Sequence, residues 1–452
     1  MTTTRTTNVT AAFIDLATFE LLESSLYGGN DAITYFVREV QKCTWFSQIP
    51  VRLSNQSGAP SFGGTANFTV SRAADYLLST WLRVELPSIS YTGSDYTGGV
   101  SWTPNVGHNL IKKVDILFND LEVQSITSFD LDWWAAFMYP SGKKDGYNQM
   151  IGNVSTLVSP STTKNAYTIN VPIPFFYTRD SGVALPTAAL PYNDIKLKFE
   201  LRDLKDILVG WSSTGLSSTP VTAAMTTTSG DFGLGAANLT DTTCECWCNY
   251  VVVSNDERSK MGAGPRDIVV EQYQKADVPA AAHTASSTVD KQFSFNHTVK
   301  MLVWAFKNST NAVSHGYHSN YTVSDPDVNS GFVLNGKEPL AQATLKYDNT
   351  ERFTLNNDYF QLVQPFYHAS QIPSGNCGAS PVGLNMYSYA LNPMSSDPSG
   401  STNYGKLTNV ALRLATSAAV KDSNSTDNQL LIRGLNFNIV RISGGALGFP
   451  VL

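Results

Sequence analysis

From Ile49 onward the chain shows short runs in which apolar and polar residues alternate, separated by turn-forming residues. Alternation with a period of two is typical of β-strands that bury one face. Asn119-Asp120 separates two such runs and tolerates the positive φ angles of a two-residue hairpin turn. Helical spacing is rare, and 129–138 is its best example. The pattern predicts an all-β chain with strands at 49–54, 67–71, 76–86, 114–118 and 121–124.

The first 45 residues differ from the rest. Apolar residues at 13, 14, 16, 19, 21 and 22, followed by Tyr27-Gly28-Gly29, predict a short amphipathic helix ahead of the first strand. The polar start lacks the apolar core of a signal peptide. No stretch approaches about 18 consecutive apolar residues, so we expect no membrane span. We interpret residues 1–45 as an arm that docks onto a partner or seals its own domain.

Five blocks of sequence recur in the same order, offset by roughly 190 to 230 residues, which indicates an internal repeat. Each copy has an alternating run, then a strand that carries a Trp (Trp81 or Trp304), then a hairpin with an Asn/Asp turn. The shared order is harder to attribute to chance than any single pair. The paired blocks are 68–81 with 293–304, 110–124 with 340–355, 129–134 with 357–362, 180–199 with 397–414, and 249–253 with 437–442.

The polar, Gly- and Pro-marked stretch 254–266 is the expected break between the copies. The sequence therefore predicts an N-terminal arm at 1–45, a first domain at 46–255 and a second at 256–452. Each domain has about eight strands and more residues than strands and tight turns require. Long loops at one end of an eight-stranded sandwich are typical of a jelly roll, so we expect two in tandem. The predicted loops are 88–108, 139–169, 203–243, 307–339 and 416–429.

The amino-acid composition excludes further classes of function. Only 15% of the 452 residues are charged, against roughly 25% in an average soluble protein. Hydrophobic residues make up 42%, enough for a large core, and the formal net charge is −6. Nucleic-acid binding needs clustered Lys and Arg, and the chain has no such cluster. We therefore expect no direct contact with nucleic acid.

Two groups of residues are candidates for metal binding. Cys244, Cys246 and Cys248 would share one face of a strand. A zinc site would need a fourth ligand and a chelating turn, so buried reduced thiols are the preferred interpretation. Asp325, Asp327 and Asn329 resemble the start of a calcium loop. However, Ser330 and Gly336 stand where such a loop needs Gly and Glu, which favours a surface loop of Asx turns.

Catalytic motifs are missing from the sequence. It contains no Gly-x-Ser-x-Gly, His-Glu-x-x-His, P-loop or Cys-x-x-Cys motif. Asp130 and Asp132 beside Trp133 and Trp134 could suggest a carbohydrate-cleaving cleft. Carboxylates two residues apart on a helix point in different directions, so packing is the preferred interpretation. We predict neither catalytic residues nor a cofactor.

Several long stretches of the sequence resemble the major capsid proteins of large icosahedral nucleocytoplasmic DNA viruses, of the iridovirus type. These stretches run from near residue 13 to the end of the chain. They are Phe-Ile-Asp-Leu-Ala-Thr at 13–18, Tyr-Phe-Val-Arg-Glu-Val-Gln at 35–41, Pro-Phe-Phe-Tyr-Thr-Arg-Asp-Ser-Gly at 174–182, Ser-Gly-Ser-Thr-Asn-Tyr-Gly-Lys at 399–406 and Gly-Gly-Ala-Leu-Gly-Phe-Pro at 444–450.

The resemblance implies a double jelly-roll protein that performs no catalysis. Three chains would form a pseudo-hexagonal capsomer, and capsomers would tile an icosahedral shell over an internal membrane. The implied partners are further copies of the chain, minor capsid and penton proteins, and membrane-associated proteins contacted through residues 1–45. Assembly in the host cytoplasm and residence in the virion follow from the same resemblance. The alternative is a carbohydrate-binding or carbohydrate-cleaving β-sandwich protein.

Overall fold

The computed structural model describes most of the chain in two compact units, residues 1–45 and 46–452. The described residues are 9–18, 20–212, 215–216, 221, 232–234, 239–279, 281–282, 287–309, 316–322, 338–348, 350–373, 383–417 and 427–449.

The first unit contains helix α1 (Val9–Ala17) and the 3₁₀ turn η1 (Glu23–Ser25). The predicted helix therefore exists but begins before Phe13 and ends before Leu21. Gly28 and Gly29 follow with φ of +86° and +98°, a conformation that favours glycine and ends the turn. None of the side chains of α1 is buried. Within the described part of the chain, no helix has the length and apolar character needed to cross a bilayer.

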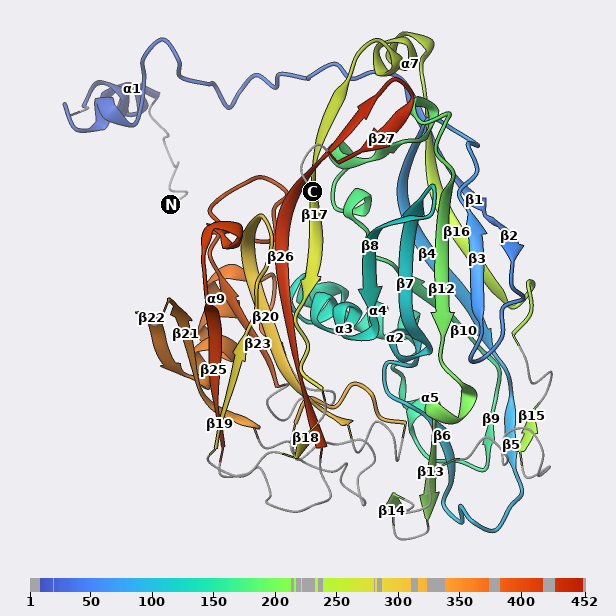
Figure 1. Ribbon diagram of the computed structural model, residues 1–452. Helices are drawn as coiled ribbons and strands as arrows, with labels where there is room; N and C mark the ends of the chain where they lie inside the picture. The colour runs from blue at the N-terminus through green and yellow to red at the C-terminus, as the bar shows by residue number, and fades with distance from the viewer. Residues whose placement is uncertain are drawn as a thin grey trace, which may run out of the picture. The chain divides into compact units, whose positions relative to one another are not determined.

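The second unit begins with a sandwich of two antiparallel sheets (Figure 1). In β12 the side chains of Ile195, Leu197 and Phe199 point into the core, whereas Lys196 and Lys198 face outward. One sheet has the order β1 (Phe46–Arg52), β16 (Cys244–Val253), β4 (Tyr76–Leu86), β10 (Tyr167–Pro172), with β11 (Leu185–Pro186) beside β4. The other has the order β2 (Ser54–Ser57), β3 (Thr65–Thr69), β12 (Ile195–Leu201), β7 (Ile111–Phe118), β8 (Leu121–Thr127).

A second sandwich follows along the chain. Its first sheet has the order β17 (Arg266–Lys275), β26 (Asp427–Ser443), β20 (Thr298–Asn308), β23 (Leu384–Ser388). Short strands β18 (Ala281–Ala282), β24 (Thr402–Asn403) and β27 (Ala446–Gly448) extend it. The facing sheet has the order β19 (Thr288–Gln292), β25 (Val410–Thr416), β21 (Leu340–Tyr347), β22 (Thr350–Asn356). Trp304 and Phe360 lie in the core between these sheets.

The two sandwiches have the same strand order. If the eight main strands of each are numbered along the chain, both contain one sheet ordered 1-8-3-6 and one ordered 2-7-4-5. This is the strand order of a jelly roll, so the fold is a double jelly-roll. Each pair of repeated sequence blocks falls on equivalent elements, for example the Trp81 strand β4 and the Trp304 strand β20. The repeat predicted from the sequence is thereby confirmed.

The equivalent hairpins β7–β8 and β21–β22 use the same turn chemistry. Asn119 and Asp120 have φ of +48° and +67°, as a two-residue turn of this type requires, and Asp348 has φ of +46°. Asn119 and Asp348 both open their turns, which sets an offset of 229 residues (348 − 119) between equivalent positions.

The long loops of the first roll are partly folded, which the sequence did not predict. They form two small sheets at the end of the roll opposite to α7 and β27 (Figure 1). Trp211 donates from Nε1 to Ser101 Oγ at 2.8 Å and helps to fix one of them. The sheets have the orders β15 (Phe232–Leu234), β5 (Ile89–Tyr91), β9 (Thr163–Lys164) and β14 (Gly215–Leu216), β13 (Leu208–Ser212), β6 (Gly99–Trp102).

Helices occur mainly where the chain leaves a sheet. The predicted helix at 129–138 is confirmed as α3, whereas the break predicted at 254–266 contains a helix, α7. The helices are α2 (Val106–Leu110), α3 (Ser128–Phe137), α4 (Lys144–Ile151), α5 (Ser155–Val158), α7 (Asn255–Gly262), the π-helical turn η7 (Tyr359–Val363) and α9 (Gln364–His368). The 3₁₀ turns are η2 (Ser141–Lys143), η3 (Phe176–Thr178), η4 (Ser181–Val183), η5 (Thr187–Ala189), η6 (Leu204–Asp206) and η8 (Tyr404–Lys406).

Candidate functional site

The contact between the two rolls, here called the inter-roll interface, is built around helix α3. The helix starts with a capping box in which Thr127 and Asp130 satisfy each other's free backbone groups. One face of α3 carries Leu131 into the core of the first roll. The other face packs on the outer side of the second roll's sheet, where it meets β20, β23 and β26. The apolar residues of this contact are Phe129, Trp133, Trp134, Phe137 and Met138 against Met301, Val303, Ala305, Leu384, Met386, Leu431 and Leu435.

A buried ion pair crosses the inter-roll interface. Arg433 of β26 donates from Nε to Asp130 Oδ1 at 2.7 Å, and its Nη1 contacts Asp277. The side chains of Arg433 and Asp130 are 3% and 0% exposed. Burial alone would raise the pKa of Asp130, but the charges of Arg433 and Lys275 outweigh it, so this pKa lies below its ordinary value. Asp130 is therefore an ionised structural group with its partner in the other roll.

Asp132 also bonds across the interface. Its Oδ2 accepts from the Tyr321 hydroxyl at 2.7 Å, and its Oδ1 lies 2.6 Å from His108 Nδ1. His108 Nε2 lies in turn 2.6 Å from the Tyr147 hydroxyl. All these partners are inside the protein, and His108 is only 1% exposed. Asp130 and Asp132 thus bind structural partners and do not form a carbohydrate-cleaving pair, as the packing interpretation predicted.

A second charged cluster lies beside the first. Arg179, which follows η3 in the first roll, donates from Nε to Glu271 Oε2 of β17 at 2.8 Å. The guanidinium group of Arg179 also lies 4.2 Å from the centre of the Trp134 ring, in a cation–π contact. Lys300 contacts the other oxygen of Glu271. Burial lowers the pKa of Lys300 to about 8, although Glu271 opposes this shift.

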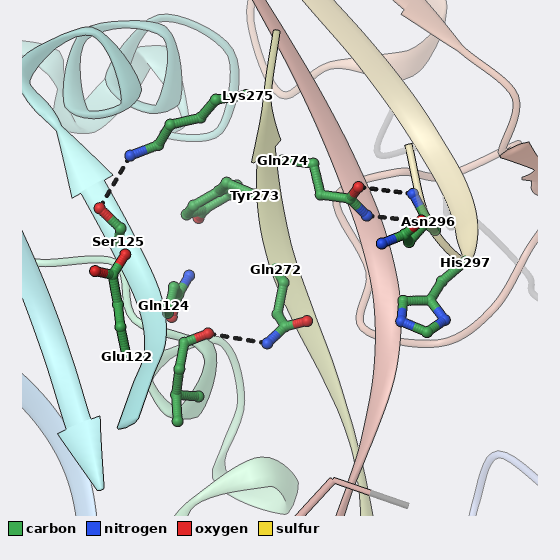
Figure 2. Close-up of a pocket in the computed structure, with 10 residues that line it drawn as sticks. Glu122, Gln124, Ser125, Gln272, Tyr273, Gln274, Lys275, Asn296 and His297 are labelled. Atoms are coloured by element: carbon green, nitrogen blue, oxygen red, sulfur yellow. Dashed lines mark hydrogen bonds between the residues drawn. The ribbon is translucent and has the colours of Figure 1, made fainter. Parts of the chain in front are cut away.

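A polar cleft of about 400 Å³ opens between β8 of the first roll and β17 of the second (Figure 2). Gln272 Nε2 donates to the Val123 carbonyl at 3.0 Å, and Lys275 Nζ donates to Ser125 Oγ at 2.9 Å. Figure 2 shows both bonds spanning the cleft. Gln272 and Lys275 therefore join the two rolls across the cleft.

The sequence did not identify these interface residues, because their partners lie far apart along the chain. Asp130 and Arg433 are 303 residues apart. One signal was available: Arg433 interrupts the apolar run Leu430-Leu431-Ile432 of a strand. A charged residue within such a run indicates a buried partner, since an unpaired buried charge is too costly.

The cysteines of β16 match the preferred interpretation. Cys244, Cys246 and Cys248 are buried in the core of the first roll, and Cys248 Sγ lies 3.1 Å from Thr80 Oγ1. Burial raises the pKa of the Cys244 thiol to about 12, so this thiol stays protonated at neutral pH. Among the described residues, no group of three or more His, Cys, Asp or Glu side chains could hold a metal ion. The calcium-loop candidates Asp325, Asp327 and Asn329 lie outside the described residues.

Exposed apolar side chains occur on one helical segment of the second roll. On η7 and α9, Leu362 is 54% exposed, Phe366 67% and Tyr367 72%. Exposed apolar patches of this kind are typical of surfaces that bind another protein. The geometry therefore offers a buried interface between the two rolls and an exposed apolar surface on the second roll.

The sequence of this chain is similar to those of known proteins. Residues 34–254 match the family model for the N-terminus of the major capsid protein, and residues 257–448 match that for the large eukaryotic DNA virus major capsid protein. The chain is 43% identical to the major capsid protein of Invertebrate iridescent virus 3, covering 98% of this chain and 99% of that protein. It is 40% identical to that of Lymphocystis disease virus 1 (isolate Darai), covering 100% of both.

Solved structures share the fold. The capsid protein VP54 of PBCV-1 matches with a TM-score of 0.72 at 21% identity, over 93% of this chain and 100% of that one. The Faustovirus major capsid protein matches with a TM-score of 0.74 at 12% identity, over 96% of both chains. The relatives are structural proteins and not enzymes, and their role is to build the virion capsid. This chain belongs to the family of major capsid proteins of large eukaryotic DNA viruses.

Proposed function

We propose that this major capsid protein forms a homotrimer with a pseudo-hexagonal outline, and that these trimers tile an icosahedral shell. The observation that carries the proposal is the identical strand order of the two rolls. Three chains with two similar rolls each place six similar units around a threefold axis, which approximates a hexagon. Hexagonal outlines tile a surface without gaps, whereas a trimer of single rolls has no such outline.

The trimer requires two different surfaces on each chain. A ring of three uses a heterologous contact, in which one surface of a subunit binds a different surface of the next. The contact is expected to bury more than about 2,000 Å² because permanent assemblies have interfaces of this size. Contacts between trimers are expected to be smaller, so that misplaced trimers can detach. The small net charge of −6 limits repulsion between many copies.

The proposal also assigns roles along the chain. Residues 46–255 and 256–452 act as the two rolls, and residues 1–45 act as an arm on the inner face of the shell. Phe46, where the arm joins, pairs with Val253 at the end of the first roll opposite to the small loop sheets. The arm would contact minor capsid proteins, penton proteins or proteins of an internal membrane. Assembly would take place in the host cytoplasm, without direct contact to the genome.

Light scattering on the purified chain tests the trimer. The expected mass is 3 × 49.2 kDa, about 148 kDa, and a mass of 49.2 kDa at every concentration would contradict it. Cross-linking of intact virions with an amine-reactive reagent tests the arm. Lys42 is expected to link to minor capsid or membrane proteins, and links from Lys42 only to other copies of this chain would contradict that role.

A further inference from the structure

The segment of the second roll that is equivalent to α3 has the features of a second contact surface. In the first roll, α3 follows the hairpin β7–β8, and in the second roll η7 and α9 follow the equivalent hairpin β21–β22. Each segment packs an apolar residue into the core of its own roll. Leu131 is 1% exposed in the first core, and Phe360 is 0% exposed in the second. These two residues are 229 positions apart, which is the offset that the turn residues Asn119 and Asp348 set.

The same offset relates the outer faces of the two segments. Four residues of α3 that contact the second roll are 0% to 8% exposed, whereas their equivalents on η7 and α9 are 42% to 72% exposed. These four equivalents are apolar or aromatic, whereas the fifth contact residue, Phe129, corresponds to Asp358. The pairs are Trp133 with Leu362, Trp134 with Val363, Phe137 with Phe366 and Met138 with Tyr367. The helical face that is buried within the chain in the first roll is therefore exposed in the second.

The receiving surface has an equivalent too. In the second roll α3 packs on the outward side chains of β20, and in the first roll the equivalent strand is β4. Leu82 and Val84 of β4 point into the core, so Trp81 and Arg83 point outward. Trp81 stacks on Trp247 of β16, with ring centres 6.3 Å apart and ring planes 12° apart. Both tryptophans are half-buried.

We propose that Leu362, Val363, Phe366 and Tyr367 of one copy dock on the Trp81–Trp247 pair of the next copy. This inference rests on the proposed trimer and names the surfaces that hold it together. The contact repeats between chains what α3 does within the chain, so contacts within and between chains alternate around the ring. The helical surface and the tryptophan surface lie on different rolls, so the contact is heterologous and can close after three copies.

The chemistry of the two surfaces is complementary. Aromatic side chains bury about 150–250 Å² each and favour edge-to-face or offset packing on other rings. Phe366 and Tyr367 already lie edge to face, with their ring centres 5.0 Å apart. Arg83 borders the tryptophan pair, and its side chain is 40% exposed beside Glu245. It can therefore lie over an incoming ring in a cation–π contact.

Two variants test the pairing, one for each surface. Phe366→Asp places a charge on the helical surface, and Trp247→Lys places one on the sheet surface. By light scattering, each variant alone is expected to fall from about 148 kDa to 49.2 kDa. Leu121→Asp, at a residue 57% exposed on the hairpin of the first roll, is the matched control and is expected to remain a trimer.

Mixing the two variants gives the sharper result. The intact tryptophan surface of Phe366→Asp can bind the intact helical surface of Trp247→Lys, but the other ends cannot continue the ring. A 1:1 mixture is therefore expected to form a heterodimer of 2 × 49.2 kDa, about 98 kDa. This species also shows that both variants are folded. Circular dichroism of each variant, and the second helical variant Leu362→Asp, guard against a folding defect.

The outcomes separate this inference from the proposed function. If the unmodified chain is a trimer and folded Phe366→Asp is also a trimer, the docking surfaces are wrong while the trimer stands. If the folded variants stay monomeric when mixed, the pairing of these two surfaces is likewise wrong. If the unmodified chain is itself a monomer at every concentration, the trimer fails, and this inference fails with it.

Discussion

Replacing Arg433 by Met removes the cation from the ion pair that joins α3 to β26. The Asp130 side chain then stays at 0% exposure without its main partner. Removing one member of a buried ion pair typically costs about 3–5 kcal/mol of stability. Asp130 keeps its bonds from the Thr127 backbone and hydroxyl, at 2.8 and 2.7 Å. We therefore expect a loss of about 3 kcal/mol at pH 7, near the lower end of that range.

The loss should depend on pH in a defined direction. In the unmodified protein the pKa of Asp130 is lowered, so its stabilising contribution is present above the unfolded pKa of about 3.9 and disappears as the pH falls through the folded value. In Arg433→Met burial dominates, and the pKa of Asp130 rises above about 3.9. The folded variant then binds a proton that the unfolded chain releases, so its stability falls as the pH rises from about 4. The difference in stability between the two proteins should therefore be smallest below about pH 4, grow as the pH rises, and be largest at neutral pH.

Urea unfolding at one fixed protein concentration, followed by tryptophan fluorescence, measures this difference, because Trp133 and Trp134 lie in the same interface. The double variant Asp130→Asn, Arg433→Met is the control, since it removes both charges. It should recover at least about half of the lost stability. A single variant that loses less than about 1 kcal/mol, or a double variant no more stable than the single one, would refute the role assigned to this pair.

Three further predictions concern the rest of the fold. Phe137→Ala should lower the free energy of unfolding by about 3–5 kcal/mol in urea titrations because this side chain is 0% exposed, whereas Leu121→Ala, at 57% exposure, should change it by less than about 1 kcal/mol. Asp120 has φ of +67°, so Asp120→Val should cost about 1–2 kcal/mol in thermal melts, and Asp120→Gly should cost little; equal losses would exclude the turn as the cause. Burial raises the pKa of Glu338 to about 7, so this residue weakens the fold as the pH rises from about 4.3 to 7. Glu338→Gln should therefore gain about 2 kcal/mol over the parent protein between pH 5 and pH 8, and a gain independent of pH would contradict this assignment.

The sequence was sufficient for features that local chemistry determines. The Asn119-Asp120 turn, the α3 helix and the alternating strands each depend on residues close together along the chain. The repeated blocks also follow one another in the same order in both copies, and this order was sufficient to predict two tandem rolls. It placed 129–134 opposite 357–362, one residue away from the offset of 229 that the equivalent turns set.

Features that depend on distant residues were beyond the sequence. In the small sheets of the first roll, most paired strands are 70 or more residues apart along the chain, such as β5 with β9 and β6 with β13, whereas β13 with β14 is a local pair. Asp130, Asp132 and Glu271 each form a hydrogen bond across the interface. In these three bonds the partners lie between 92 and 303 positions apart along the chain. No local pattern predicts which residues pair, because the two partners of each bond belong to different rolls.

Divergence between the two equivalent helical segments would allow one architecture to supply the contact within the chain and the proposed contact between chains. The α3 surface uses two tryptophans and a buried ion pair, and separating that pair would leave a buried charge without its partner. The η7–α9 surface carries Leu362, Val363, Phe366 and Tyr367, which are 42% to 72% exposed. It has smaller apolar residues in place of the tryptophans, and Tyr367 can keep its hydroxyl hydrated. In the proposed trimer, docking would remove these apolar side chains from water, as at other surfaces that bind a protein partner.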